Sequence, residues 1–381
     1  MRVLLVSHDF LPNHPAGTEI YTYQFGVEQR RRGHDVHVFT TEKEISRPHL
    51  SVGVREYGGL TVHELFNNLF YDRFEETWDS ADITETFTRF LDDLKPDVVH
   101  FMHLMYLSVG CVEAAAERAP VFFTLHDYWL QCARFGQRVH ADRSICHSIE
   151  FSRCGECMAD FKYRQTPFER LTAKALARVR RVSGLDLGPA TRRAIARVKR
   201  SGNALSPAPP GSLRMPEEGQ PPAPAPADLS PAAGAMHRAI VARDEGLRER
   251  VLPAVTRFIA PSRFLRASFV EWGIPPDKIQ HVRTGIDTDR FADVRRTRGE
   301  RLRIGFIGTV VPHKGLHVLL EAWRQLPDAL RSRAELAVWG PTDHTPEYVN
   351  AVRALAEQVG VPLRGRIASE EVPDALRQVD L

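Results

Sequence analysis

The chain has 381 residues, of which 43% are hydrophobic and 26% are charged, and its formal net charge is +3 at pH 7. These proportions are typical of a soluble globular protein, and the small net charge argues against nucleic acid as a partner. The length exceeds that of one typical domain core, so we expect two domains.

The amino terminus indicates no targeting segment. Only four apolar residues, Val3 to Val6, precede Ser7, which is too short for a signal peptide. No apolar run reaches the ~20 residues that cross a bilayer. We therefore expect a cytoplasmic protein and leave open a peripheral contact with the inner face of the membrane.

Strands alternate with helices through the first part of the chain. A buried strand is predicted at residues 2–7, followed by a loop at 12–17 and a helix from Thr18, as N-cap, to Arg32. Further apolar runs predict more elements: strands at 36–40, 97–102 and 121–125, and a helix around 111–118. This alternation predicts a parallel sheet with helices on both faces.

Ligands of such sheets bind at the carboxyl ends of the strands. Residues 13–19, 100–103 and 126–128 follow predicted strands, so we expect them to lie near one another. His126 comes directly after the strand that ends at Leu125 and is a candidate for hydrogen bonding or electrophilic assistance. A purely structural histidine is the alternative.

A Cys-rich loop is predicted at residues 130–160. Its spacing is C-x13-C-x7-C-x2-C, formed by Cys132, Cys146, Cys154 and Cys157. This pattern favours a structural zinc site, with His140 and His147 as substitute ligands. An iron–sulfur cluster, a redox disulfide and four unrelated thiols are the alternatives.

Two segments of unusual composition follow. Residues 162–200 contain twelve Lys or Arg and only two acidic residues, which predicts a basic helical region. It is either a solvated helical surface or a contact with an acidic membrane or lipid phosphate. Residues 201–235 contain nine prolines and are expected to be a disordered insertion within the first domain.

The alternation resumes after residue 255. The predicted elements are a strand at 257–260, a helix from the cap Ser262 to Trp272, a turn-rich crossing at 282–291, strands at 302–307, 335–339 and 363–366, and helices at 346–359 and up to 378. We place the first domain at residues 1–295 and the start of a second at 296–381. Residues 379–381 resemble the beginning of another strand, so the second domain is expected to be incomplete.

Residues 301–323 combine a strand, a glycine turn at Gly308 and a helix with apolar residues at helical spacing. Lys314 precedes the helix, whose first turn has unpaired N–H groups, and this arrangement suits a phosphate. An ordinary strand-to-helix joint with a solvated lysine is the alternative.

Five motifs in this order resemble glycosyltransferase family 4 of the GT-B fold. They are Gly17-Thr18-Glu19, TLHDYW at 124–129, APSRF at 260–264, TGID at 284–287 with Phe291, and GTVVPHKG at 308–315. The resemblance implies two Rossmann-like domains that face each other across a cleft. It also implies a retaining hexosyltransferase of polysaccharide biosynthesis, which moves a sugar from a nucleoside diphosphate to a glycan or lipid-linked acceptor without a catalytic cofactor.

The resemblance also implies roles for single residues. His126 matches the active-site histidine that contacts the donor sugar, and Gly17 matches the loop glycine near the donor phosphates. Thr309, Lys314 and Gly315 fall in the donor-binding motif, where Lys314 would neutralise the leaving pyrophosphate.

Two departures keep a second hypothesis open. Thr309 stands where the family often has Arg, and Arg283 or Arg303 is a candidate substitute. The family's paired glutamates are expected after Leu381, which indicates a carboxyl-terminal truncation. The alternative function is therefore a non-catalytic GT-B remnant that binds or scaffolds.

Overall fold

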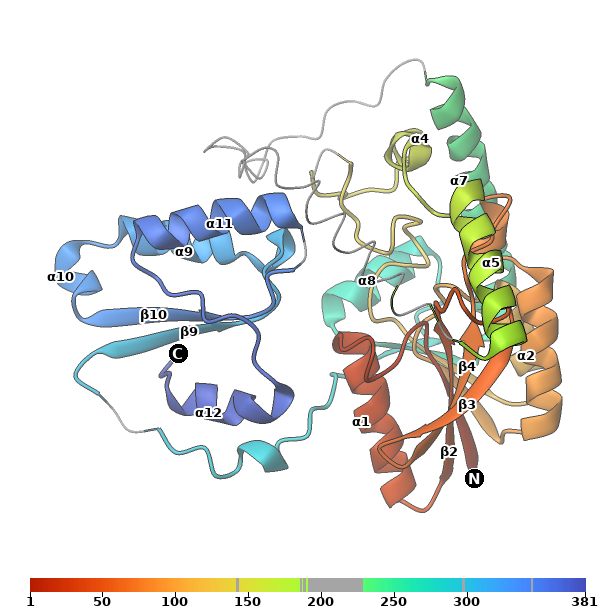
Figure 1. Ribbon diagram of the computed structural model, residues 1–381, viewed down its shortest axis with the longest axis horizontal. Helices are drawn as coiled ribbons and strands as arrows, with labels where there is room; N and C mark the ends of the chain where they lie inside the picture. The colour runs from red at the N-terminus through yellow and green to blue at the C-terminus, as the bar shows by residue number, and fades with distance from the viewer. Residues whose placement is uncertain (142–143, 186, 188–189, 191–228, 297–298, 344) are drawn as a thin grey trace. The chain divides into compact units, whose positions relative to one another are not determined.

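The computed structural model describes residues 1–141, 144–185, 187, 190, 229–296, 299–343 and 345–381 (Figure 1). Among the described residues the chain passes from a first compact unit to a second between Ile286 and Asp287. Each unit has its own sheet and its own hydrophobic core. No helix among the described residues is both long and apolar enough to span a membrane.

The first unit is built on an eight-stranded sheet with the order β3-β4-β2-β1-β5-β6-β7-β8. Every neighbouring pair is parallel except β3 and β4. The strands are β1 (Arg2–Val6), β2 (Asp35–Glu42), β3 (Val52–Tyr57), β4 (Leu60–Phe66), β5 (Val98–Phe101), β6 (Val121–Thr124), β7 (Arg257–Ala260) and β8 (Ile279–His281). The predicted parallel sheet is thus confirmed.

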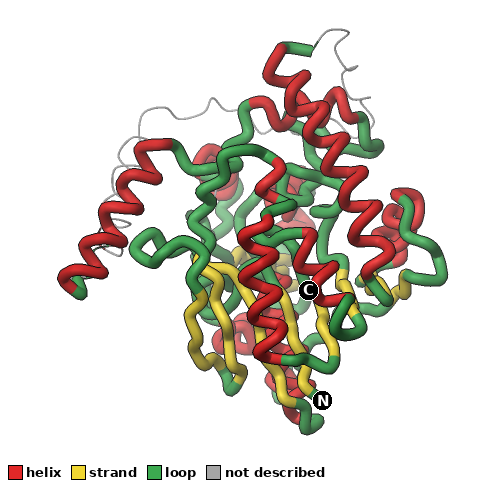
Figure 2. Tube along the Cα trace, turned by 90° about the vertical axis from the view of Figure 1, so that its right-hand side faces the viewer, coloured by secondary structure: helices red, strands yellow, loops and turns green. Residues whose placement is uncertain are grey.

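Both faces of this sheet are covered, since alternate residues of its central strand β1 belong to two different hydrophobic cores. In β1, Leu4 and Val6 belong to one core and Val3 and Leu5 to the other. Figure 2 shows a helix lying in front of the yellow strands. The helices are α1 (Gly17–Arg31), α2 (Ala81–Leu94), α3 (Val109–Ala116), α4 (Phe151–Ala159), α5 (Pro167–Ser183), α7 (Pro231–Ala254) and α8 (Arg263–Trp272).

Two sequence expectations are decided at helix starts. Ser262 caps α8, as predicted, by accepting a hydrogen bond from the N–H of Leu265 at 3.1 Å. The expected cap Thr18 is wrong, since α1 begins one residue earlier, at Gly17, and places Thr18 inside the first turn.

The insertion expected up to Ala235 also ends earlier than predicted. Pro231 starts α7 behind the cap Ser230, because proline is preorganised for the first helical position. Residues 201–228 of that insertion lie outside the described part of the chain. The basic segment is helical over α5, and its residues beyond 190 are likewise not described.

The β3–β4 hairpin was not anticipated, although its signal is present. Two alternating runs flank Gly58 and Gly59, whose φ angles of 56° and 80° suit a tight hairpin turn. The hairpin adds the antiparallel edge of the sheet.

The second unit contains the parallel pair β9 (Leu302–Ile307) and β10 (Ala334–Trp339). Figure 1 shows α9 (Leu316–Gln325) and α11 (Pro346–Gln358) on one side of these strands and α12 (Val372–Arg377) on the other. α10 (Asp328–Arg331) is a short helix before β10. The predicted α/β alternation is therefore present in this unit as well.

The outer strands of the second unit are only partly formed. Leu363 makes a single bridge to Val338 and does not extend into the predicted strand. Asp380 donates its N–H to the carbonyl of Arg303 at 2.7 Å, and Leu381 accepts from Gly305 at 2.8 Å. These bonds place Asp380 and Leu381 beside β9, although no strand is formed there.

Candidate active site

The carboxyl ends of β1, β5 and β6 bring several imidazoles and carboxylates together. The His8 and His103 ring centroids lie 4.2 Å apart, and His8 Nε2 lies 3.4 Å from Glu19 Oε1. His126 lies edge-on to Tyr21, with ring centroids 5.1 Å apart. The prediction that the segments around Glu19, His103 and His126 meet at this edge is confirmed.

Burial favours the neutral form of the His126 imidazole. Burial, followed by the charge of His103, lowers the pKa of His126 to about 4. Its Nε2 is buried and makes no hydrogen bond within the part of the chain that the structure describes. A buried polar atom without a partner is unfavourable, so this nitrogen is suited to a ligand hydroxyl.

Two further side chains in the cluster have buried atoms that lack described partners. Glu19 is 2% exposed, and its Oε2 makes no hydrogen bond with a described residue. Nδ1 of His8 is likewise buried without a described partner. Burial raises the pKa of Glu19 and lowers that of His8, which is reduced further by His103. The cluster therefore combines unpaired acceptors and donors in a site of low polarity.

Asp9 is the most strongly perturbed carboxyl in this cluster. Burial raises the pKa of Asp9 to about 7, and the neighbouring Glu19 and Glu42 add to the effect while His14 opposes it. Asp9 Oδ1 lies 3.8 Å from His14 Nε2, which itself lies 3.3 Å from Glu42 Oε1. Hydrogen bonding to Glu42 raises the pKa of His14.

Sequence reasoning did not assign roles to His8, Asp9, Glu19 or His103. The signal that identified His126 was its position directly after a strand, and His8, Asp9 and His103 share that position. Glu19 was noted only as part of a motif. Its burial depends on the tertiary packing of α1 against the sheet edge.

Gly17 begins α1 at the same edge. A Cβ placed on Gly17 would meet no heavy atom within 4 Å, so open space adjoins the helix amino terminus. Helix amino termini favour anions because their first N–H groups lack helical partners.

A buried arginine holds the loop that follows His126. Arg243 of α7 is 3% exposed and donates to the carbonyls of Trp129 at 2.6 Å and Leu130 at 3.3 Å. Its guanidinium also lies 4.5 Å from the Trp129 ring centroid. Asp127 accepts from the Trp129 N–H at 2.8 Å and lies 3.1 Å from His103 Nε2. These contacts fix the segment that carries His126.

The four cysteines of the loop are free thiols that influence one another. Burial raises the pKa of Cys154 to about 12, and Cys146, Cys132 and Cys157 contribute in that order. His140 Nδ1 lies 3.4 Å from Cys157 Sγ. Within the described ranges, which omit 142–143, no group of three or more His, Cys, Asp or Glu is arranged to hold a metal. Zinc stays a prediction.

In the second unit, the predicted strand, glycine turn and helix are present. β9 ends at Ile307, a 3-10 turn spans Pro312–Lys314, and Gly315 has φ 72° before α9. Gly340 closes the other side of the turn, since a Cβ there would lie 1.8 Å from the Gly308 carbonyl oxygen. Lys314 is exposed and makes no ion pair or side-chain hydrogen bond with any described residue.

The candidate cation Arg303 cannot replace the arginine expected at Thr309. Arg303 lies at the beginning of β9, whereas Thr309 follows the end of the strand. Its guanidinium pairs with Asp380, with Nη2 2.7 Å from Oδ1. Lys314 is therefore the cation that the motif itself supplies.

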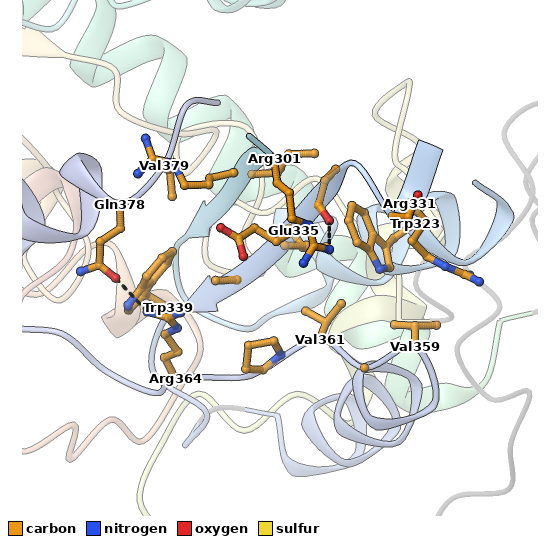
Figure 3. Close-up of a pocket in the computed structure, with 18 of the residues that line it drawn as sticks. Arg301, Trp323, Arg331, Glu335, Trp339, Val359, Val361, Arg364, Gln378 and Val379 are labelled. Carbon is orange, nitrogen blue, oxygen red and sulfur yellow. Dashed lines mark hydrogen bonds between the residues drawn. The ribbon is translucent and has the colours of Figure 1, made fainter. Parts of the chain in front are cut away.

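A cavity of about 770 Å³ lies elsewhere in the second unit (Figure 3). Trp339 and Arg364 line it, and Arg364 donates to Gln378 Oε1 at 2.9 Å. None of Thr309, Lys314 and Gly315 lines this cavity. It is therefore separate from the predicted phosphate turn.

Solved glycosyltransferase structures resemble the chain in fold. An α,α-trehalose 6-phosphate synthase from Burkholderia multivorans is 11% identical, covers 99% of this chain and 76% of its own, and has a TM-score of 0.51. A UDP-forming α,α-trehalose-phosphate synthase from Burkholderia xenovorans is 12% identical, with coverages of 100% and 78% and a TM-score of 0.51. These likenesses confirm the predicted GT-B class of fold.

The sequence comparisons identify the family. No curated protein matches the chain. The model of Glycosyltransferase Family 4 matches residues 15–182 and 232–290, which contain Gly17, His126 and the loop after it. The match spans more than half of the chain and agrees with the fold. The chain therefore belongs to glycosyltransferase family 4.

Proposed function

We propose that this protein transfers a sugar, with retention of anomeric configuration, from a nucleoside diphosphate to a glycan or lipid-linked acceptor. The observation that carries this proposal is the buried cluster at the sheet edge, where His126 Nε2 and Glu19 Oε2 have no partner among the described side chains. Such atoms suit sugar hydroxyls. One protein of similar fold is UDP-forming, which supports a nucleoside diphosphate donor.

The residues have distinct roles in the proposed reaction. Neutral His126 hydrogen-bonds a hydroxyl of the donor sugar, and Gly17 leaves room for the donor phosphates. Lys314, with Thr309 and Gly315 in the same turn, neutralises the charge that develops on the leaving diphosphate. No catalytic cofactor is required, because this electrostatic role is filled by a side chain.

Nucleotide binding tests the role of Lys314. Lys314→Ala is expected to weaken the binding of UDP, measured by calorimetry, by about 1.5 to 3 kcal/mol, because one charge-assisted contact is lost. Arg324→Ala is the matched control, since Arg324 lies on α9 but pairs with Glu321. Equal UDP affinity in the two variants would remove Lys314 from the donor site.

Product analysis tests the reaction itself. Incubation with nucleoside diphosphate sugars and an acceptor is expected to give a glycoside with the anomeric configuration of the donor, which proton NMR measures. An inverted product would refute retention. UDP binding without transfer to any acceptor would favour the second candidate, a non-catalytic binding protein, which Thr309 in place of arginine supports.

The Cys-rich loop and the basic segment belong to the acceptor side in this proposal. Zinc at Cys132, Cys146, Cys154 and Cys157 would fix the loop after His126. A peripheral contact of the basic helix α5 with a membrane would bring lipid-linked acceptors to the enzyme. The proximity of His140 to Cys157 supports the first idea, and the exposed cations of α5 support the second.

A further inference from the structure

A basic pocket of about 710 Å³ lies in the first unit, separate from the histidine cluster. Its walls are the loop after β2 (residues 45–49), the segment after β4 (residues 68 and 70) and one side of α5. None of its described lining residues is Asp or Glu. Six cations line it: Arg47, Arg170, Lys174, Arg178, Arg180 and Arg181. The pocket is therefore suited to an anion.

Four of these cations have no carboxylate partner. Arg47, Lys174, Arg178 and Arg181 make no ion pair with any residue in the described ranges. Five of the six cations lie along a single helix, α5. Uncompensated like charges repel, and an anionic ligand would remove that repulsion.

The remaining cations are held in place by the pocket walls. Arg170 pairs with Asp72, with Nη1 2.6 Å from Oδ1, and lies over the Phe70 ring. Arg180 donates to Ser46 Oγ at 2.9 Å. These contacts join α5 to the ends of β2 and β4, so the pocket has a fixed floor.

An orphaned polar atom also belongs to this pocket. Asn68 is 1% exposed and its Nδ2 donates to the Arg47 carbonyl at 3.3 Å, but its Oδ1 has no partner among the described residues. A buried amide oxygen of this kind needs a donor such as a hydroxyl. The ligand thus has both an anionic group and a hydroxyl.

The pocket lies at the same sheet edge as the candidate active site. Glu42, the last residue of β2, bonds to His14 of the histidine cluster, and the pocket wall begins three residues later at Ile45. A molecule bound in the pocket would therefore lie at the same edge of the sheet as the histidine cluster, which suits an acceptor.

α5 also carries three strongly exposed apolar side chains. Phe168, Leu171 and Val182 are 77%, 67% and 78% exposed, and their spacing places them on one side of the helix. A helix that combines exposed apolar side chains with uncompensated cations is typical of a contact with an anionic bilayer.

We propose that the pocket binds the phosphate of a lipid-linked acceptor while the apolar side of α5 contacts the bilayer that holds the lipid. This inference rests on the proposed glycosyl transfer and names its acceptor class. Phosphate oxygens accept from Lys174, Arg178 and Arg181, and a hydroxyl beside the phosphate donates to Asn68 Oδ1. The growing glycan extends toward His126.

Vesicle binding tests the pocket. Full-length protein is expected to sediment with phosphatidylcholine vesicles that contain phosphatidic acid and not with pure phosphatidylcholine. The double variant Lys174→Ala/Arg178→Ala should lose at least roughly tenfold in vesicle affinity, because charge-assisted contacts are removed. Arg89→Ala/Arg238→Ala removes the same charge from α2 and α7, outside the pocket, and should bind like the unchanged protein.

Two further measurements separate the outcomes. Phe168→Ser/Val182→Ser should lose vesicle binding but keep the binding of inorganic pyrophosphate measured in the presence of UDP. Equal loss in the two charge variants would show an effect of net charge and overturn the pocket. Unchanged vesicle binding in Phe168→Ser/Val182→Ser would refute the proposed contact between α5 and the bilayer that holds the lipid. UDP binding is measured in parallel, and its absence would refute the glycosyl transfer while the vesicle result still judges the pocket.

Discussion

The stability of this protein should depend on pH through Asp9. Burial raises its pKa from an ordinary 3.8 to about 7 in the folded state. Between about pH 4 and pH 7 the folded protein keeps a proton that the unfolded chain has lost, so the free energy of unfolding falls as the pH rises. Asp9→Asn removes this titration. The free energy of unfolding of Asp9→Asn should exceed that of the unchanged protein by almost nothing below pH 4.

Above pH 7 that advantage reaches at most about 4 kcal/mol, since one pKa unit corresponds to about 1.4 kcal/mol. This is an upper limit, because the Asp9 side chain is 23% exposed and solvent reduces the effect. His126 titrates in both proteins and cancels in the difference. Urea unfolding at a series of pH values measures the difference in the free energy of unfolding between Asp9→Asn and the unchanged protein.

Asp35→Asn is a control of opposite sign. A hydrogen bond from Arg2 holds the pKa of Asp35 below its ordinary value, so Asp35 stabilises the fold at neutral pH and loses that effect as the pH falls through its folded pKa. The Asp35→Asn variant should therefore be less stable at neutral pH, with a deficit that shrinks in acid. A difference between Asp9→Asn and the unchanged protein that stays constant from pH 4 to pH 8 would refute the reasoning about burial.

Three further outcomes are expected. His126→Phe should reduce the rate of sugar transfer at least ~100-fold, because a positioned hydrogen-bonding group is lost. The urea midpoint of unfolding should stay unchanged or rise, since a buried unpaired nitrogen is removed. A lowered midpoint would indicate a structural histidine. Arg243→Met should lower the free energy of unfolding by about 2 to 4 kcal/mol, because the Trp129 and Leu130 carbonyls lose their donor, and an unchanged value would contradict the proposed clamp. Elemental analysis should find about one zinc per chain, and folded metal-free protein would rule the site out.

Local sequence patterns determined most of the elements that lead to the site. The apolar run after Arg2 predicts β1, and the cap Ser262 and the spacing of Leu316, Leu320 and Trp323 predict α8 and α9. Such signals act within a few residues, so they can be recognised without knowledge of the fold. Parallel topology then follows, and with it the expectation that His126 lies near residues 13–19.

Tertiary structure alone decided which polar side chains become buried and unpaired. Nothing local distinguishes Asp9 or Glu19 from a solvated carboxylate, and their perturbed pKa values arise from burial and from neighbours on other strands and helices. The basic pocket is also formed by packing, since α5 and Arg47 are far apart in sequence. The motifs are therefore specified locally in the sequence. The effects of burial and of neighbouring charges on pKa values depend on distances in space, so they arise only in the folded protein.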